Sequence, residues 1–275
     1  MRETTYEKYF SQNHMCEAEI LSLKLYFCWH SPEAFTGRLY KLYATAQTFF
    51  VECGYDTGSI DKDETLYNTL SEGLLTVEAM MLVCTDPQTD PEFYTKLFAL
   101  IHGSHRDIIL EHSPIRAAET IRMLTLELQG PDLAPNLKLY ENKLRERAYL
   151  HEKRDVSFAG QLKRYCKTRP TREVLVMRGA MHQFMLEKAL TSQNLAFTSY
   201  LSHHNLPGDA QSAIMERMQR GEVVNRKDLL RSMVELLQYK KKGYDPKTIT
   251  IAQVNEIQKE LSNLSEPELE KSLTM

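Results

Sequence analysis

The chain has 275 residues, enough for one large domain or two small ones. Its hydrophobic fraction of 42% and charged fraction of 26% are ordinary for a globular protein, which argues against a disordered or fibrous chain. Its 34 basic and 37 acidic residues leave a net charge of -3, so we expect no nucleic-acid partner and no general attraction to anionic lipid.

Short apolar runs alternate with helical patterns through the first three quarters of the chain. Strands are predicted over residues 20–28, 48–53, 107–111, 173–177 and 195–201. Helices are predicted over residues 31–47, 63–84, 91–101, 114–128, 136–167 and 180–191. This order predicts an α/β fold, with a mostly parallel central sheet of four to six strands flanked by helices.

The strand pattern ends near Pro207, and helical patterns follow over residues 208–220, 226–240 and 250–264. The polar tail from Ser265 is predicted to fray. We therefore predict an α/β catalytic-type domain over residues 1–206 and a helical extension packed on it over residues 207–275. The apolar stripe within residues 229–237 is typical of core packing, with a partner-binding face as the alternative.

A titratable side chain follows every predicted strand. In chain order the strand ends carry Trp29 and His30, Glu52, Glu111 and His112, Gly179 and His182, and His203 and His204. Ligands of open α/β sheets bind outside the carboxyl ends of the strands, so this edge is the expected site.

His30, Glu52 and His182 form the sharpest set among these residues. Two imidazoles and one carboxylate suit a divalent metal ion such as zinc, manganese or cobalt. Without a metal, the same trio can perform general acid–base chemistry, because histidine titrates at about pH 6.5. The alternative is that these are inert, hydrogen-bonded side chains at loop mouths.

The predicted helix over residues 136–167 has an apolar face that polar residues interrupt. Arg147, His151, Arg154 and Asp155 lie in the interruption. Charged groups on an apolar stripe are costly unless they meet partners or a ligand, which indicates a functional arginine here. A solvated helix face is the alternative.

Other features are expected to be structural. The five cysteines include no CxxC pair, which argues against disulfides and thiolate zinc and favours a cytoplasmic protein. No apolar run reaches the ~18 residues of a membrane span, and we see no secretory signal. The basic stretches 164–178 and 240–242 are predicted to be solvated surface.

The order of four motifs resembles a superfamily that unites the Tiki and TraB proteins, the erythromycin esterases and the ChaN-type haem-uptake proteins. In that family a strand ends in GxxH, a second strand ends in glutamate, an arginine segment resembling ERDR follows, and a third strand ends in GxxH. The corresponding segments, within about residues 20 to 190, are Phe27-Cys28-Trp29-His30, Glu52, Glu152-Lys153-Arg154-Asp155 and Gly179-Ala180-Met181-His182. Phe27 stands where the family has glycine.

The resemblance implies a hydrolase that cleaves an ester or amide of a small molecule or peptide. His30 or His182 would activate water, directly or on a divalent metal held by His30, Glu52 and His182. Glu52 would orient the histidine, and Arg154 would stabilise the developing oxyanion. The residues expected to bind substrate are Trp29, Glu111, His112, Arg147, His151 and Gly179.

The alternative to a hydrolase is a non-catalytic binding or regulatory protein that uses the same pocket. Phe27 and Trp29 favour it, because two bulky aromatic side chains would fill space near the first motif. They would also suit a planar apolar ligand such as haem, with a histidine as axial ligand. A homo-oligomer is compatible with either interpretation.

Overall fold

The structure is a computed structural model that describes residues 23–52, 60–83, 91–112, 133–169, 172–202, 210–244 and 251–274. The predicted helix over residues 114–128, together with His203 and His204, lies outside the described residues. Cys28 and Cys166 are buried free thiols, and burial raises the pKa of Cys166 to about 11. Neither is therefore a reactive thiolate. The other three cysteines are among the residues not described.

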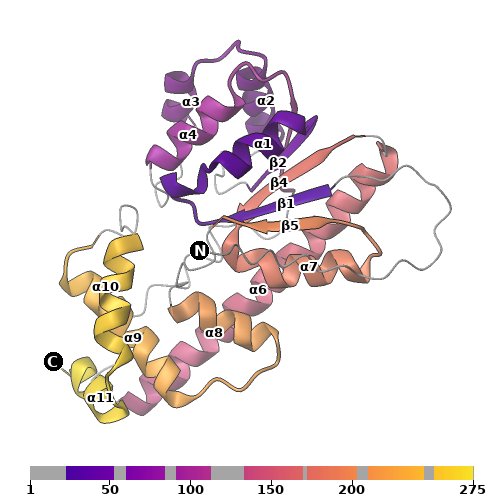
Figure 1. Cartoon of the computed structure of the whole chain (residues 1–275). Helices are drawn as coiled ribbons and strands as arrows, with labels where there is room; N and C mark the ends of the chain where they lie inside the picture. The colour runs from indigo at the N-terminus through magenta and orange to yellow at the C-terminus, as the bar shows by residue number, and fades with distance from the viewer. Residues whose placement is uncertain are drawn as a thin grey trace, which may run out of the picture.

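Five parallel strands form one sheet in the order β3-β2-β4-β1-β5, which confirms the predicted α/β fold (Figure 1). The strands are β1 (Leu23–Cys28), β2 (Thr48–Val51), β3 (Asp107–Leu110), β4 (Val174–Gly179) and β5 (Thr198–Leu201). In the central pair, Leu25 is in register with Val176, and Cys28 with Gly179. The central strands read as continuous apolar runs because both of their faces are buried.

Helices cover the two faces of the sheet. On one face, Tyr26, Phe49 and Met177 pack in a cluster with the helices that precede β3. These are η1 (Pro32–Ala34), α1 (Gly37–Thr45), α2 (Ile60–Ser71), α3 (Val77–Val83) and α4 (Pro91–Ile101). On the other face, Phe27 and Val176 pack against α6 (Leu133–Thr168) and α7 (Gln183–Ser192). Successive residues of each strand thus lie on opposite faces of the sheet.

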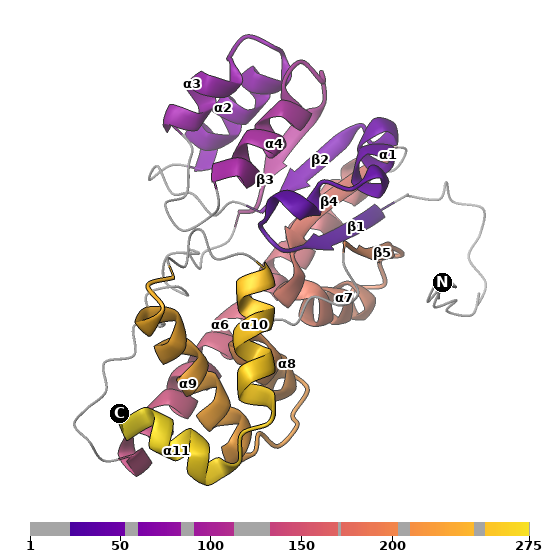
Figure 2. The ribbon, with the colours of Figure 1, turned by 60° about the vertical axis from the view of Figure 1, so that its left-hand side comes forward.

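The remaining helices form a second layer against the first half of α6 (Figure 2). They are α8 (Ala210–Gln219), α9 (Arg226–Lys241), α10 (Ile251–Ser262) and α11 (Glu266–Thr274). The stripe of α9 belongs to this core, with Leu230 and Met233 buried against Leu144 of α6. The prediction of a fraying tail is wrong, because α11 is helical and its Leu269 is fully buried.

Two predicted helices are divided in the structure, each at an identifiable residue. The helix predicted over residues 31–47 is interrupted by extended Thr36, whose hydroxyl caps α1 by accepting from the Leu39 N–H. The helix predicted over residues 63–84 ends near Gly73, whose φ of +74° is left-handed and leads into a turn before α3. In both places a residue that caps or ends a helix divides it, although the spacing of the apolar residues continues across that point.

Side chains of α2, rather than another strand, cover the outer edge of β3. Asn68 donates to the Ile108 carbonyl at 2.8 Å and accepts from the Ile108 N–H at 3.0 Å. Glu64 accepts from the Leu110 N–H at 3.0 Å. Such caps satisfy backbone groups that would otherwise pair with another chain.

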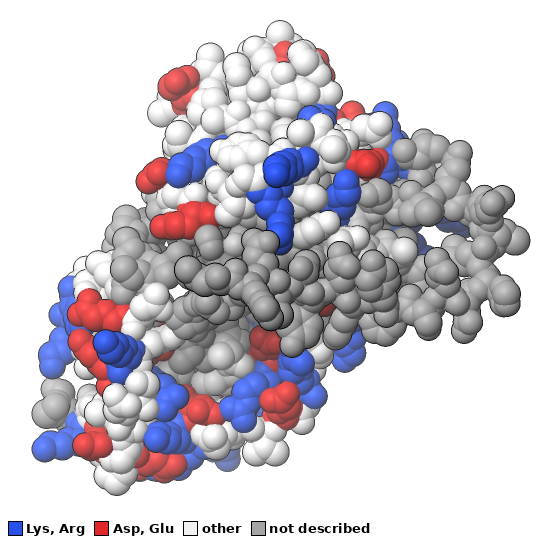
Figure 3. All heavy atoms as spheres, in the orientation of Figure 1, with Lys and Arg blue, Asp and Glu red and all other residues white. Residues whose placement is uncertain are grey.

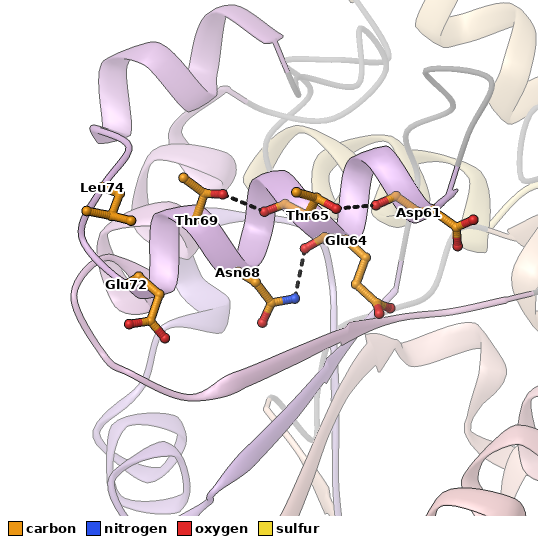
Figure 4. A pocket seen from close by; sticks show the side chains of 7 residues that line it. All are labelled: Asp61, Glu64, Thr65, Asn68, Thr69, Glu72 and Leu74. Carbon is orange, nitrogen blue, oxygen red and sulfur yellow. Dashed lines mark hydrogen bonds between the residues drawn. The ribbon is translucent and has the colours of Figure 1, made fainter.

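An open hollow lies along this outer side of α2 (Figure 4). Its lining residues are Asp61, Glu64, Thr65, Asn68, Thr69, Glu72 and Leu74. None of them is a predicted site residue, and Glu64 and Asn68 are engaged in capping β3.

Acidic and basic side chains are interspersed over the helical layer on the face that Figure 3 shows. Several are paired, as Arg226 is with Glu266 at 3.2 Å and Lys242 with Glu260 at 3.1 Å. None of the helices in the described ranges has both the length and the apolar character needed to span a bilayer.

Candidate functional site

The side chains of His30, Glu52, Arg154 and His182 come together at the carboxyl edge of the sheet. His30 follows β1, Glu52 follows β2, and His182 ends the η2 turn (Ala180–His182) after β4. These three strands are neighbours in the sheet, so their ends lie side by side. Arg154 reaches the same place from the middle of α6.

The carboxylate of Glu52 is the centre of this cluster. Its Oε2 atom lies 3.5 Å from Nε2 of His30 and accepts from the Gly179 N–H at 2.7 Å. Its Oε1 atom lies 3.2 Å from Nη2 of Arg154 and 3.3 Å from Nε2 of His182. Burial alone would raise the pKa of Glu52, but His182 and Arg154 more than offset burial and hold that pKa well below its ordinary value.

Behind Glu52 lies a buried network of ion pairs. Arg154 donates to Glu111 through Nε at 2.8 Å, and Arg178 donates to Glu111 and to Asp155, each at 2.8 Å. Asp155 also lies 2.9 Å from Nδ1 of His182. Every charged group in this network therefore faces one of opposite sign, the condition under which buried charges are tolerated.

The network favours the charged form of His182. Burial alone would lower the pKa of this imidazole, but the carboxylates of Asp155 and Glu52 outweigh burial, and the pKa is raised. A protonated His182 balances the cluster, because Glu52, Glu111 and Asp155 then face two guanidinium groups and one imidazolium.

His30 is the member of the cluster that solvent reaches. Its side chain is 33% exposed, whereas that of Glu52 is 8% exposed and those of Arg154 and His182 are fully buried. The imidazole stacks on Phe93 of α4 with ring centroids 5.0 Å apart. His30 therefore lies between solvent and the buried, anionic carboxylate of Glu52.

The residues predicted to bind substrate fall into two groups. Glu111, His151 and Gly179 belong to the cluster, and the ring of His151 lies 4.8 Å from that of His182. The others lie around it. Trp29 is half-buried beside His30, His112 lies 3.2 Å from Glu64 of α2, and Arg147 donates to Gln211 of α8 at 3.2 Å.

Arg178 and Asp155 were not among the predicted site residues. The prediction that the stretch 164–178 is solvated surface is wrong at Arg178, which is 1% exposed and lies over the ring of Phe158. The alternation along β4 carries the missing signal, because residues 174, 176 and 178 share one face and the first two pack toward α6. For Asp155, the sequence pattern that indicates a role in the site is its position next to Arg154, where polar residues interrupt the apolar face of the helix.

Position 179 has no room for a side chain, and its backbone N–H also donates to Glu52. A Cβ atom added there would lie 3.1 Å from Oε2 of Glu52 and 3.7 Å from Nε2 of His30. Gly179→Ala is therefore expected to displace the Glu52 carboxylate from His30 and to slow any reaction that depends on this contact by at least about tenfold, equivalent to about 1.4 kcal/mol. Gly160→Ala is the control, since a Cβ there meets only Arg164 at 3.6 Å. Equal activity of the two variants would contradict this role.

The cluster does not fit a divalent metal ion. Both oxygens of Glu52 already face donors, and both ring nitrogens of His182 face carboxylates. The guanidinium of Arg154, 3.2 Å from Glu52, places positive charge where a cation would have to bind. Within the described ranges, no group of three or more His, Cys, Asp or Glu residues is arranged to hold a metal.

Compared with protein-family models, with curated proteins and with solved structures, the chain matches none of them. The resemblance to the Tiki, TraB and erythromycin esterase superfamily therefore stays a prediction that rests on the four motifs.

Proposed function

We propose that the protein hydrolyses an ester or amide bond, with His30 as the general base. The observation that carries the proposal is the pairing of an accessible imidazole with a buried carboxylate, 3.5 Å apart, at the carboxyl edge of a parallel sheet. A base must reach both solvent and substrate, and His30 does so better than the other members of the cluster. This is the arrangement in which a carboxylate orients a histidine that acts as a base.

The proton transfers follow from this pairing. Glu52 beside Nε2 favours the tautomer of His30 with its proton on Nε2, which leaves Nδ1 able to take a proton from water. The water oxygen then bonds to the carbonyl carbon, and the carbon–oxygen or carbon–nitrogen bond to the leaving group breaks. His30 returns its proton to the departing alcohol or amine.

Arg154 is assigned a positioning role in this proposal. Its guanidinium is buried and engaged with Glu111 and Glu52, so it holds the Glu52 carboxylate anionic rather than facing a substrate carbonyl. His182, held by Asp155, supports Glu52 in the same way. The reaction therefore has one accessible catalytic group and a rigid charged support.

The proposal is tested with a panel of p-nitrophenyl esters and p-nitroanilides and the full-length protein. Turnover above the buffer rate is expected for at least one ester, and its loss in His30→Gln attributes it to this site. Absence of turnover across the panel would overturn the hydrolase and leave a binding protein.

A non-catalytic binding protein is the second candidate function. The pairing of every charge in the buried network favours it, and a Soret band in the purified protein would identify the ligand as haem.

Removal of metals is expected to leave hydrolysis unchanged. The groups that face the Glu52 carboxylate are the Gly179 N–H and the Arg154 guanidinium rather than a metal ion. A chelator therefore removes nothing from this site. Activity after dialysis against EDTA is therefore expected to equal that of the untreated protein. Loss of activity with EDTA and recovery on addition of zinc, manganese or cobalt would instead support the metal site that the sequence predicts at His30, Glu52 and His182.

A further inference from the structure

A buried polar seam crosses the middle of α6, between the two hydrophobic clusters that this helix joins. Leu144 and Ala148 pack with the helical layer, while Phe158 and Leu162 pack with the sheet. Between them Arg147, His151 and Arg154 follow one another at spacings of four and three residues, so they share one face of the helix. All three are buried.

His151 is the unexplained member of this seam. Its side chain is 4% exposed, and neither ring nitrogen has a hydrogen-bond partner. Leaving a buried polar group without a hydrogen-bond partner destabilises the folded state, so such groups are rare in folded proteins. The network next to it is different, because there His182 is held by Asp155 and each guanidinium by a carboxylate.

Gln211 of α8 contributes a second unsatisfied donor at the same seam. Its Oε1 accepts from Nη1 of Arg147 at 3.2 Å, which fixes the orientation of the amide because a guanidinium only donates. The amide nitrogen Nε2 is buried and has no partner. Arg147 is therefore a neighbour of both groups: it donates to Gln211, and it interacts electrostatically with His151, one helical turn away on α6.

The charges around His151 select the kind of ligand. Burial lowers the pKa of this imidazole, and His182, Arg147 and Arg154 lower it further, whereas Glu52 opposes them. A neutral His151 therefore lies in a region of positive potential and can offer one N–H group. A carboxylate suits such a place, because it is anionic and presents two oxygens to two donors.

We propose that His151 and Gln211 bind a carboxylate carried by the substrate, next to the Glu52 cluster. The proposal rests on the hydrolase function and names its substrate class, an ester or amide with a free carboxylate near the scissile bond. The ring of His151 lies 4.8 Å from that of His182, and Nε2 of His182 lies 3.3 Å from Oε1 of Glu52, so the proposed carboxylate site adjoins the Glu52 cluster.

Ligand binding is the first part of the test. Millimolar glutarate is expected to raise the Tm of the native protein, and dimethyl glutarate is not. The shift is expected to disappear in His151→Leu and Gln211→Leu. It is expected to persist in Gln219→Leu, since that glutamine also lies on α8 but already donates to the Ala148 carbonyl at 3.1 Å. An equal shift with inorganic phosphate would overturn the choice of a carboxylate, and an equal shift in His151→Leu would overturn the site.

Stability without ligand separates a binding role from a structural one. His151→Leu removes two unsatisfied nitrogens from a buried place, so the Tm of the unliganded variant is expected to rise by about 2–4 °C. A histidine that merely supports the fold would give the opposite sign. A fall in Tm together with an unchanged response to glutarate would therefore overturn the proposal.

Turnover distinguishes the failure of this inference from the failure of the hydrolase. The ratio of kcat/KM for mono-p-nitrophenyl glutarate to that for p-nitrophenyl valerate is expected to exceed about tenfold in the native protein and to fall by about tenfold in His151→Leu. Hydrolysis of both esters without preference would overturn the carboxylate site alone. Binding of glutarate without any hydrolysis would overturn the hydrolase alone.

Discussion

His30→Gln is expected to lower kcat for ester hydrolysis by about 10²–10⁴-fold, because it removes the proton acceptor of the proposed reaction. Glutamine keeps much of the size and polarity of the side chain but cannot take a proton near neutral pH. The imidazole is 33% exposed, so the substitution is expected to change the free energy of unfolding by no more than about 0.5 kcal/mol. Steady-state kinetics and urea denaturation measure the two effects separately.

His102→Gln is the matched control for this experiment. His102 is exposed just after α4 and outside the Glu52 cluster, so the same substitution there tests the loss of an imidazole as such. We expect native kinetics from it. If His30→Gln retained at least half of the native kcat while His182→Gln lost activity with its fold intact, the base would be His182 instead.

Arg178→Met is expected to lower the free energy of unfolding by about 3–5 kcal/mol, a large fraction of the stability of an ordinary domain. The guanidinium is 1% exposed and donates to both Glu111 and Asp155. Methionine fills much of the volume but leaves the buried carboxylates of Glu111 and Asp155 without that cation. Urea denaturation followed by circular dichroism provides the measurement.

Arg172→Met tests whether burial, rather than pairing, is responsible for this effect. Arg172 is also paired with an aspartate, Asp107, but both side chains are more than a third exposed. Exposed pairs of this kind contribute about 0–1 kcal/mol, so a small change is expected. Similar losses in the two variants would show that pairing with an aspartate, rather than burial, is responsible for the effect.

The place of the candidate site could be predicted because parallel strands end at one edge. His30, Glu52 and His182 each follow an apolar run, and once those runs are strands their ends must meet. Arg154 could be predicted because it interrupts an apolar helix face. These inferences need only local patterns and one general rule of α/β sheets.

The chemistry inside the site was harder to predict, because it depends on contacts between distant segments. No pattern along the chain says that Glu52 faces the Gly179 N–H and the Arg154 guanidinium, which is what makes a metal a poor fit. Arg178 looked like part of a basic surface, since its carboxylate partners lie 67 and 23 residues away. The strand order likewise depends on pairings that are remote in sequence.

The 36-residue helix α6 has a consequence for how the molecule unfolds. Its first half contributes Leu137, Tyr140 and Leu144 to the helical cluster, and its second half contributes Phe158 and Leu162 to the sheet cluster. Neither cluster is complete without it, so loss of either one exposes apolar surface on the helix that both share. The two layers are therefore thermodynamically linked, and heat is expected to melt them in a single cooperative transition.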